Sequence, residues 1–346
     1  MVTSREHILN ITKKLKPSLR YDFSEDFDVW QKRAKEKLTD ILGLPLECAS
    51  DDCLTFGECY EKDGIEFKRF VFQSEPGYFV PCCLVKKKET TKAPLVICLQ
   101  GHSPGMYISL GEVKKESDIA YHKNKESDFA VQAAKRGFVA IAIEQRYMGE
   151  VGYPGESWKG PACVAASGDT GANEAMAALL IGRCAIGERV WDISRTIDLA
   201  ENRFADICDT SKIICLGTSG GGTATLYASC VEERITLSVP SCAVCTFESS
   251  IMNVNHCPCN FVPGVRKYFD MGDLACLVAP RGLIIPCGDE DPIFPYEGVN
   301  ECYNIVKNVY DKIGIPDKCR LVVGTGGHKF YKDITWNAVL EMFGKE

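Results

Sequence analysis

The stretch IICLGTSGGGT, residues 213–223, carries the pattern G-x-S-x-G immediately after a short apolar run and immediately before a helix-like segment. The apolar run is too short for a helix and long enough for a buried strand. A tight turn between a strand and a helix favours glycine, because a Cβ atom at Gly217 or Gly221 would clash with neighbouring elements. The stretch therefore predicts a strand, a sharp turn with Ser219 at its apex, and a helix that opens at once.

The same alternation of short apolar runs and helix-like segments continues on both sides of this turn. Apolar runs are found at 95–99, 138–143, 213–216, 283–286 and 321–323, and helix-like segments at 128–136, 190–200, 222–229, 300–313 and 334–343. Strands that are apolar throughout are buried on both faces, which is typical of parallel sheets covered by helices. The sequence therefore predicts an α/β fold with a doubly wound, mostly parallel sheet and helices on both faces.

Three further regions frame this core. Residues 1–63 are polar and helix-like, with Asp- and Cys-rich loops near their end, and predict an N-terminal helical extension packed on the core. Runs at 65–73 and 78–85, separated by Glu-Pro-Gly, predict an antiparallel strand pair at a sheet edge. We expect 64–346 to form the catalytic domain, with 149–188 inserted over the strand ends.

Composition excludes several classes of protein. The chain has 346 residues, 45% of them hydrophobic and 25% charged, which is ordinary globular usage rather than a disordered chain. Its net charge of −7 argues against a nucleic-acid-binding protein, and it contains no apolar run of the ~20 residues that would span a membrane. Charges scattered through the first residues argue against a signal peptide, so the 19 cysteines predict a reduced, cytoplasmic protein. The sequence leaves open whether the protein forms a homo-oligomer.

Three residue types in chain order predict nucleophilic catalysis at the carboxyl ends of the strands. Ser219 needs a general base, and His328 lies in a Gly-rich loop directly after the last apolar run. The acid follows the run at 283–286, where Asp291 precedes a proline that holds it in extended backbone. We favour Asp291 as the acid, with Asp289 as the second choice.

An oxyanion site is expected from two backbone amides. Gly220 follows the serine at the helix N-terminus, and His102 lies in the loop after the first parallel strand, within LQGHSPG at 99–105. Four further residues are candidates for the pocket walls: Ser103, Arg146, Trp158 and His256.

A rival pattern of cysteines needs weighing. Cys242 and Cys245 are followed by His256, Cys257 and Cys259, a set that could bind zinc. The last two cysteines are separated by only one residue, and cysteine is abundant throughout the chain. Packing or pocket lining is therefore favoured, and we expect no metal.

The chain resembles the α/β-hydrolase superfamily and, within it, the acetylxylan-esterase-like group related to dienelactone hydrolases. The resemblance runs from about residue 64 to the C-terminus and rests on the following segments: LQGHS at 99–103, EQRYMGE at 144–150, RVWDISRTIDLA at 189–200, GTSGGG at 217–222, HCPCN at 256–260, MGDLACLVAPRGLIIPCGDEDPIFP at 271–295 and GTGGHKFY at 324–331. Gln100 departs from the pattern, since many relatives have histidine there.

The resemblance implies an α/β-hydrolase fold and a serine carboxylesterase without a cofactor. By similarity, Ser219, Asp291 and His328 would be nucleophile, acid and base, and the substrates would be small esters of short acyl groups, acetylated sugars among them. Two alternatives remain. One is a serine peptidase of prolyl-oligopeptidase type, although no propeller-sized region precedes the catalytic residues. The other is an inactive hydrolase-fold binding module with a metal site in the segment 242–259.

Overall fold

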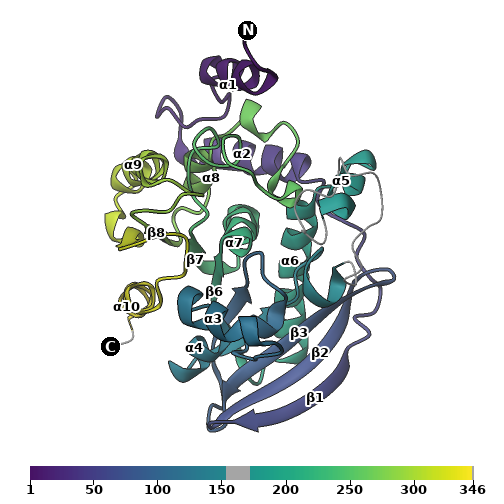
Figure 1. The fold of residues 1–346 in the computed structure, drawn as a ribbon. Coiled ribbons are helices and arrows are strands. Elements are labelled where there is room, and N and C mark those ends of the chain that lie inside the picture. The colour runs from purple at the N-terminus through teal and green to yellow at the C-terminus, as the bar shows by residue number, and fades with distance from the viewer. Residues whose placement is uncertain (153–171, 345–346) are drawn as a thin grey trace.

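The computed structural model describes residues 1–152 and 172–344. Within them the strands form one nine-stranded sheet, and helices lie on both of its faces (Figure 1). The strands are β1 (Thr55–Lys62), β2 (Ile65–Glu75), β3 (Tyr78–Lys87), β4 (Ala93–Leu99), β5 (Val139–Ile143), β6 (Cys208–Thr218), β7 (Ile235–Ser241), β8 (Gly282–Gly288) and β9 (Cys319–Gly324). The helices are α1 (Ser4–Lys14), α2 (Phe27–Ile41), α3 (Glu116–Lys125), α4 (Phe129–Lys135), α5 (Ala172–Leu180), α6 (Ala185–Arg203), α7 (Gly220–Val231), α8 (Met271–Cys276), α9 (Tyr296–Lys312) and α10 (Lys332–Phe343).

The sheet has the strand order β1-β2-β3-β5-β4-β6-β7-β8-β9. β1, β2 and β3 pair antiparallel, β3 pairs antiparallel with β5, and every later pairing is parallel. The strand order reverses around β4, as it does in doubly wound folds, where the site lies beyond the carboxyl ends of the strands. The predicted mostly parallel sheet is confirmed.

Alternation along each central strand decides which helices cover which face. In β4, Leu95, Ile97 and Leu99 pack into one cluster with α2, α6, α7, α8 and α9. The intervening Val96 and Cys98 pack into a second cluster with α4 and α10 on the opposite face. Because consecutive side chains of a strand point to opposite faces, a run that is apolar throughout needs a helical layer on each side.

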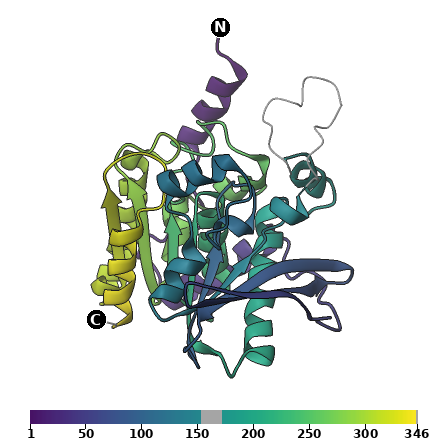
Figure 2. The ribbon, with the colours of Figure 1, turned by 60° about the horizontal axis from the view of Figure 1, so that its bottom comes forward.

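The N-terminal region differs from the helical extension expected over 1–63. Helices α1 and α2 are present, but residues 55–62 form β1, the edge strand of the sheet. Seven of its eight residues are exposed, so the strand lacks the apolar run by which strands are recognised. α1 lies at one end of the molecule (Figure 2), where Arg5 donates to Asn253 and Lys13 pairs with Glu248. α2 packs on the core through Trp30, Ala34 and Leu38.

The region expected as an insertion divides into two helices where it is described. α5 ends at Leu180 and α6 begins at Ala185, because Gly182 adopts a φ of +77° that breaks the helix between them. No helix among residues 1–152 and 172–344 is long and apolar enough to cross a membrane.

Candidate active site

Ser219 lies at the turn between β6 and α7, as the sequence predicts. Its backbone has φ 53° and ψ −123°, a strained left-handed conformation for a residue with a side chain. Its amide donates to the carbonyl oxygen of Ser241 in the neighbouring strand β7, at 2.9 Å. This hydrogen bond fixes the turn to the sheet and holds the serine at the N-terminus of α7, where the helix dipole favours negative charge.

The glycines around Ser219 are required by close backbone approach. A Cβ atom at Gly217 would lie 2.5 Å from the carbonyl oxygen of Gly221, and one at Gly222 would lie 2.6 Å from that of Ser241. A Cβ atom at Gly220 would lie 2.7 Å from Cε1 of His102. The imidazole of His102 is therefore packed against the start of α7, beside the serine.

The loop after β4 passes directly beside the serine. A Cβ atom at Gly101 would lie 3.1 Å from Cβ of Ser219 and 3.0 Å from the carbonyl oxygen of Thr218. The amide of His102 follows at the next position of this loop, as the predicted oxyanion site requires. Gln100 is fully buried and donates through Nε2 to Oε1 of Glu144 at 2.8 Å.

Glu144 anchors this loop, a role that the sequence analysis did not predict. Its carboxylate also accepts the amide of Met106 at 2.9 Å, so it ties both ends of the stretch 100–106 to the end of β5. Burial raises the pKa of Glu144 to about 7. Its position at the carboxyl end of a parallel strand is the signal that could have marked it.

Asp291 and His328 form a buried pair at the ends of β8 and β9. Nδ1 of His328 lies 2.7 Å from Oδ2 of Asp291, and the other carboxylate oxygen accepts the amides of Ile293 and Phe294 at 2.8 and 3.0 Å. Burial by itself would raise the pKa of Asp291, but the hydrogen bonds from His328 and the two amides outweigh it and lower this pKa. The aspartate therefore stays ionised beside the imidazole.

The other candidate acid has a different contact. Asp289 is exposed and accepts the amide of Gly326 at 2.7 Å, so it shapes the loop that carries His328 without touching its ring. The ring of Phe294 stacks on His328 with centroids 5.8 Å apart, which fixes the imidazole plane. Asp291 therefore contacts the ring of His328, whereas Asp289, the second choice for the acid, does not.

Ser219 and His328 line one cavity of about 260 Å³. Its remaining walls are mostly polar and are formed by Gly101, His102, Tyr121, Lys125, Ser127, Thr218, Asn255, His256, Cys257, Asn260, Ile293, Lys329 and Phe330. Among the described lining residues there are two lysines and no carboxylate. The cavity is slightly smaller than the ~300–1,000 Å³ common for ligand pockets and suits a small, polar ligand.

His256 forms part of the wall of this cavity and does not serve as a second base. Its Nε2 lies 3.1 Å from Oγ of Ser250, whose hydroxyl donates to the carbonyl oxygen of Ile293, so His256 is the donor. Burial first, and then the charges of His102 and His328, lower its pKa to about 4. His256 is therefore a neutral wall residue at neutral pH.

The other candidate pocket residues have different positions. Ser103 is absent from the cavity lining, and its hydroxyl points to the carbonyl oxygen of Gly105 in its own loop, at 3.5 Å. Trp158 lies outside the described residues. Arg146 is buried away from the cavity and is therefore not a pocket residue.

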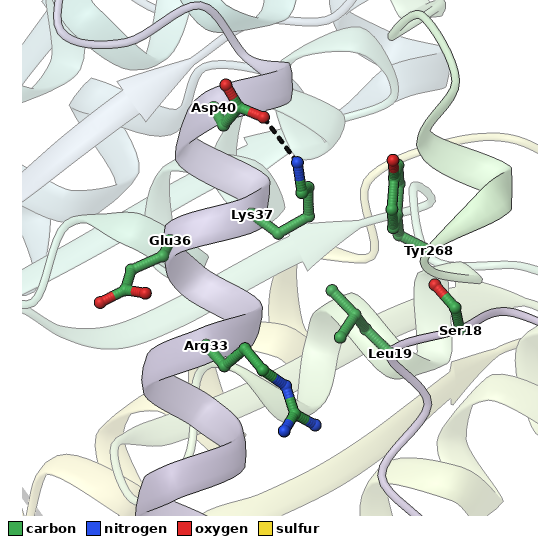
Figure 3. Close-up of a pocket in the computed structure, with 7 residues that line it drawn as sticks. All are labelled: Ser18, Leu19, Arg33, Glu36, Lys37, Asp40 and Tyr268. Atoms are coloured by element: carbon green, nitrogen blue, oxygen red, sulfur yellow. Dashed lines mark hydrogen bonds and ion pairs between the residues drawn. The ribbon is translucent and has the colours of Figure 1, made fainter.

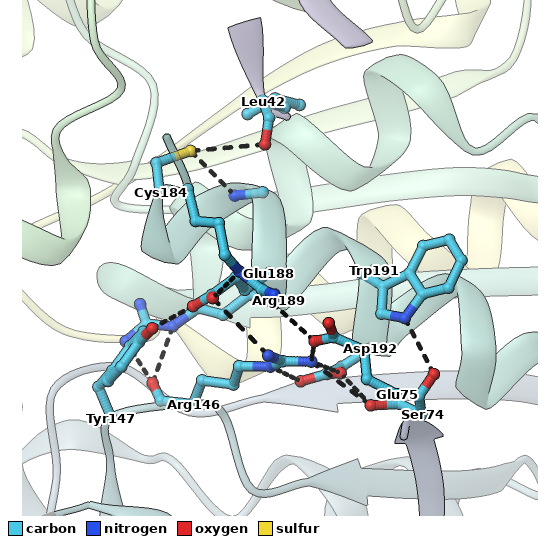
Figure 4. Close-up of polar contacts among 12 residues, drawn as sticks. Leu42, Ser74, Glu75, Arg146, Tyr147, Cys184, Glu188, Arg189, Trp191 and Asp192 are labelled. Carbon is cyan, nitrogen blue, oxygen red and sulfur yellow. Dashed lines mark hydrogen bonds and ion pairs between the residues drawn. The ribbon is translucent and has the colours of Figure 1, made fainter. Parts of the chain in front are cut away.

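Arg146 forms the centre of a buried ion cluster (Figure 4). Its guanidinium contacts Glu75 at 2.6 Å and Asp192 at 2.8 Å, and Arg183 in turn contacts Glu75 at 2.7 Å. Trp191 donates to the carbonyl oxygen of Ser74 at 3.1 Å. These contacts tie β2, the end of β5 and α6 together through side chains that do not line the cavity, which is a structural role.

The predicted cysteine set separates into two places. Sγ of Cys242 lies within 4.8 Å of ligand atoms of Asp291 and His328, whereas Cys257 and Cys259 cluster with His102. Cys245 belongs to neither group. Among the described residues, the cysteines weighed in the sequence therefore do not form one ligand set, because closeness along the chain does not determine which side chains meet in the fold.

A second hollow lies on the surface of α2 and encloses about 440 Å³ (Figure 3). Its lining includes Lys37, Asp40 and Tyr268, and Lys37 is paired with Asp40 at 2.7 Å. None of its lining residues is shared with the Ser219 cavity, and it contains no nucleophile paired with a base.

A serine at a strained strand-to-helix turn, with an aspartate–histidine pair at the ends of later strands, has the chain order of the α/β hydrolases. The sheet order and helical layers agree, so the chain has the α/β-hydrolase fold.

The known proteins that this chain resembles are described as hydrolases and esterases. A sequence profile described as Abhydrolase family matches residues 1–157. A Bacillus subtilis (strain 168) protein described as a hydrolase and named YtaP is 24% identical over 259 residues, covering 74% of this chain and 78% of its own length. 4-O-methyl-glucuronoyl methylesterase 1 of Wolfiporia cocos is 27% identical over 181 residues, 45% of this chain and 44% of its own, so the match spans less than half of that protein.

Among solved structures, a Bacteroides fragilis protein described as an acetyl xylan esterase superposes with a TM-score of 0.74. It is 15% identical, and the superposition covers 93% of this chain and 82% of that one. At this identity the likeness supports the fold.

Proposed function

We propose that this protein is a serine carboxylesterase that hydrolyses short acyl esters of carbohydrates through an acyl-enzyme intermediate. The observation that carries the proposal is the contact between His328 and the ionised Asp291 in the cavity that also exposes Ser219. The relatives that are described as esterases of xylan or glucuronoyl groups support the same class of substrate.

Ser219 attacks the ester carbonyl while Nε2 of His328 takes the hydroxyl proton. Because Nδ1 of His328 donates to Asp291, the free Nε2 is the acceptor, and the aspartate stabilises the imidazolium as it forms. The imidazolium then protonates the leaving alcohol, which departs and leaves an acyl group on Ser219. A water molecule activated by His328 attacks this acyl group, releasing the acid and restoring the serine.

The tetrahedral oxyanion rests on the amides of Gly220 and His102. Both amides belong to segments held close to Ser219 by backbone packing, and the hydrogen bonds of Glu144 fix the second segment. Donors fixed before the reaction stabilise the developing charge without reorganising, which is why each is worth about 10²–10³ in kcat.

The cavity favours a small acyl group and a hydroxylated alcohol. Its volume of about 260 Å³ leaves little room for a long chain, and Asn255, Asn260 and Tyr121 offer hydrogen bonds to sugar hydroxyls. Lys125 and Lys329 provide positive charge near the carboxylate that the reaction releases. The 18 described cysteines form no disulfide with one another, which fits a reducing compartment, and we place the enzyme in the cytoplasm.

The test is hydrolysis of p-nitrophenyl acetate, butyrate and octanoate by wild type and Ser219→Ala, followed by release of acetate from acetylated xylo-oligosaccharides. We expect turnover to fall with acyl length and to vanish in Ser219→Ala. Ser103→Ala is the matched control, because that hydroxyl faces its own loop, and it should retain turnover. Equal rates for wild type and Ser219→Ala would refute the proposal, and cleavage of prolyl peptides alone would point instead to a peptidase.

A further inference from the structure

A cluster of soft donor atoms lies beside the proposed oxyanion site. Nε2 of His102 and the two Sγ atoms of Cys257 and Cys259 all lie within 4.8 Å of one another, and Nε2 of His102 is 3.1 Å from Sγ of Cys259. His102 comes from the loop after β4, whereas the cysteines flank the first residue of a short 3₁₀ turn, Pro258–Asn260. The fold therefore brings these donors together from segments about 155 residues apart in the sequence.

A buried cation lies beside Cys259. Arg189 is 2% exposed, and its Nη1 lies 3.4 Å from Sγ of Cys259. The rest of its guanidinium donates to the carbonyl oxygen of Arg146 at 2.8 and 3.2 Å, and no ion pair joins Arg189 to a carboxylate in the described parts of the chain. A thiolate that forms at Cys259 on metal binding therefore has a buried positive charge beside it.

Cys259 differs in its contacts from the cysteines that pack the core. Its Sγ contacts Nε2 of His102 at 3.1 Å and Nη1 of Arg189 at 3.4 Å. By contrast, Cys98 lies in β4 and Cys215 in β6, and their Sγ atoms contact a backbone carbonyl oxygen and a threonine hydroxyl.

We propose that His102, Cys257 and Cys259 bind a thiophilic divalent cation, Zn²⁺ in the first instance, as a Cys₂His site beside the Ser219 cavity. Tetrahedral zinc with Zn–S of about 2.3 Å and Zn–N of about 2.0–2.1 Å needs donor atoms roughly 3.5–3.8 Å apart, which lies within the observed 4.8 Å limit. The two thiolates neutralise the dication. Arg189 then donates to a ligating sulfur, the kind of outer contact that orients metal ligands.

Binding releases protons from the ligands. The metal displaces the thiol protons of Cys257 and Cys259 to solvent and takes the lone pair of Nε2 of His102, whose ring proton is then on Nδ1. His102 and Cys257 both line the Ser219 cavity, so the fourth coordination position faces the substrate. The imidazole also packs on Gly220, and its movement onto a metal disturbs both proposed oxyanion donors.

Zinc binding should therefore inhibit ester hydrolysis. This consequence, unlike the binding itself, rests on the proposed function. Inhibition is accordingly a second readout, and direct measurement of the bound metal is the first.

The binding experiment uses full-length protein that has been stripped with a chelator and kept reduced by a phosphine. Co²⁺ is titrated in, followed by Zn²⁺, while the near-ultraviolet thiolate-to-cobalt charge-transfer band and the visible bands of tetrahedral Co²⁺ are recorded. We expect one equivalent of Co²⁺ to produce both features, Zn²⁺ to remove them, and bound zinc to survive gel filtration at a ratio of one per chain.

Variants assign the ligands. Cys259→Ser and Cys257→Ser should each weaken Zn²⁺ binding by more than about 100-fold, whereas Cys59→Ser, an exposed thiol on β1, should leave it unchanged. Far-ultraviolet circular dichroism verifies folding, and the partly exposed Cys257 provides a milder substitution should Cys259→Ser fail to fold. Absence of the charge-transfer band in reduced wild type would overturn the proposal. It would also be overturned if Cys242→Ala abolished binding while Cys257→Ser and Cys259→Ser retained it, which would place the metal on Asp291 and His328.

Discussion

Replacing Glu144 by glutamine should change how stability depends on pH. The carboxyl group of Glu144 is 1% exposed, and burial raises its pKa from the usual 4.5 to about 7. Because the folded-state pKa lies above that of the unfolded chain, the native protein binds more protons between these two values. The contribution of Glu144 to the free energy of unfolding is therefore fully present below pH 4.5 and is lost as the pH rises to about 7.

The size of the effect on the free energy of unfolding follows from the shift in the pKa of Glu144. A difference between 4.5 and about 7, at 1.36 kcal/mol per pH unit, corresponds to about 3 kcal/mol across the whole window. Glutamine has a similar shape and does not titrate. The free energy of unfolding of Glu144→Gln minus that of wild type should therefore rise by about 3 kcal/mol from below pH 4.5 to above pH 7, whatever constant offset the substitution introduces.

Equilibrium urea unfolding, followed by circular dichroism at a series of pH values, measures this difference. Glu75→Gln is the matched control, because ion pairs with Arg183 and Arg146 outweigh burial and lower the pKa of Glu75. The free energy of unfolding of Glu75→Gln minus that of wild type should fall as the pH rises, and this change should occur below pH 4.5. A difference for Glu144→Gln that stays flat between pH 4.5 and 8 would refute the assignment of a buried, titrating carboxyl at the loop.

Three other substitutions test separate parts of the account. Asp291→Asn should lower kcat for p-nitrophenyl acetate by about 10⁴, because the imidazole loses the partner that sets its tautomer, whereas Asp289→Asn should retain most activity; equal losses would contradict the assignment. Gly220→Ala keeps its own backbone amide but places a methyl group 2.7 Å from Cε1 of His102, so it should push His102 away and lower kcat by up to about 10²–10³, the contribution of one oxyanion donor; unaltered kcat would argue against this oxyanion site. Trp30→Ala should lower the free energy of unfolding by about 3–5 kcal/mol in urea melts, since Trp30 is 1% exposed; a change below 1 kcal/mol would mean that α2 contributes little to the core.

The central sheet could be predicted because its strands are buried on both faces. Runs such as 95–99 and 213–216 are apolar without interruption, which leaves little freedom in assigning them. β1 escaped prediction because an edge strand with seven exposed residues has no apolar face to recognise. The predicted boundary starts the catalytic domain at residue 64, whereas the sheet already begins nine residues earlier, at Thr55.

The proposed catalytic residues could be located from the sequence because each follows a recognisable strand in a fixed chain order. The choice between Asp291 and Asp289 favoured the residue that contacts His328, since the proline after Asp291 restricts its backbone.

Residues whose role depends on contacts between distant loops could not be found in this way. The anchoring of the loop by Glu144 depends on the pairing of β4 with β5, and the approach of His102 to Cys259 depends on two loops that meet only in the folded chain. Arg146, a candidate pocket residue from the sequence, does not line the cavity and instead pairs with the carboxylates of Glu75 and Asp192.

The most direct test of the central claim is to label the nucleophile covalently. Wild type is treated with a fluorophosphonate, which reacts with an activated serine, and the modified peptide is identified by mass spectrometry. We expect one adduct per chain on Ser219, formed much more slowly in His328→Gln and absent from Ser219→Ala. Labelling of another serine, or labelling of Ser219 at the same rate without His328, would contradict the account.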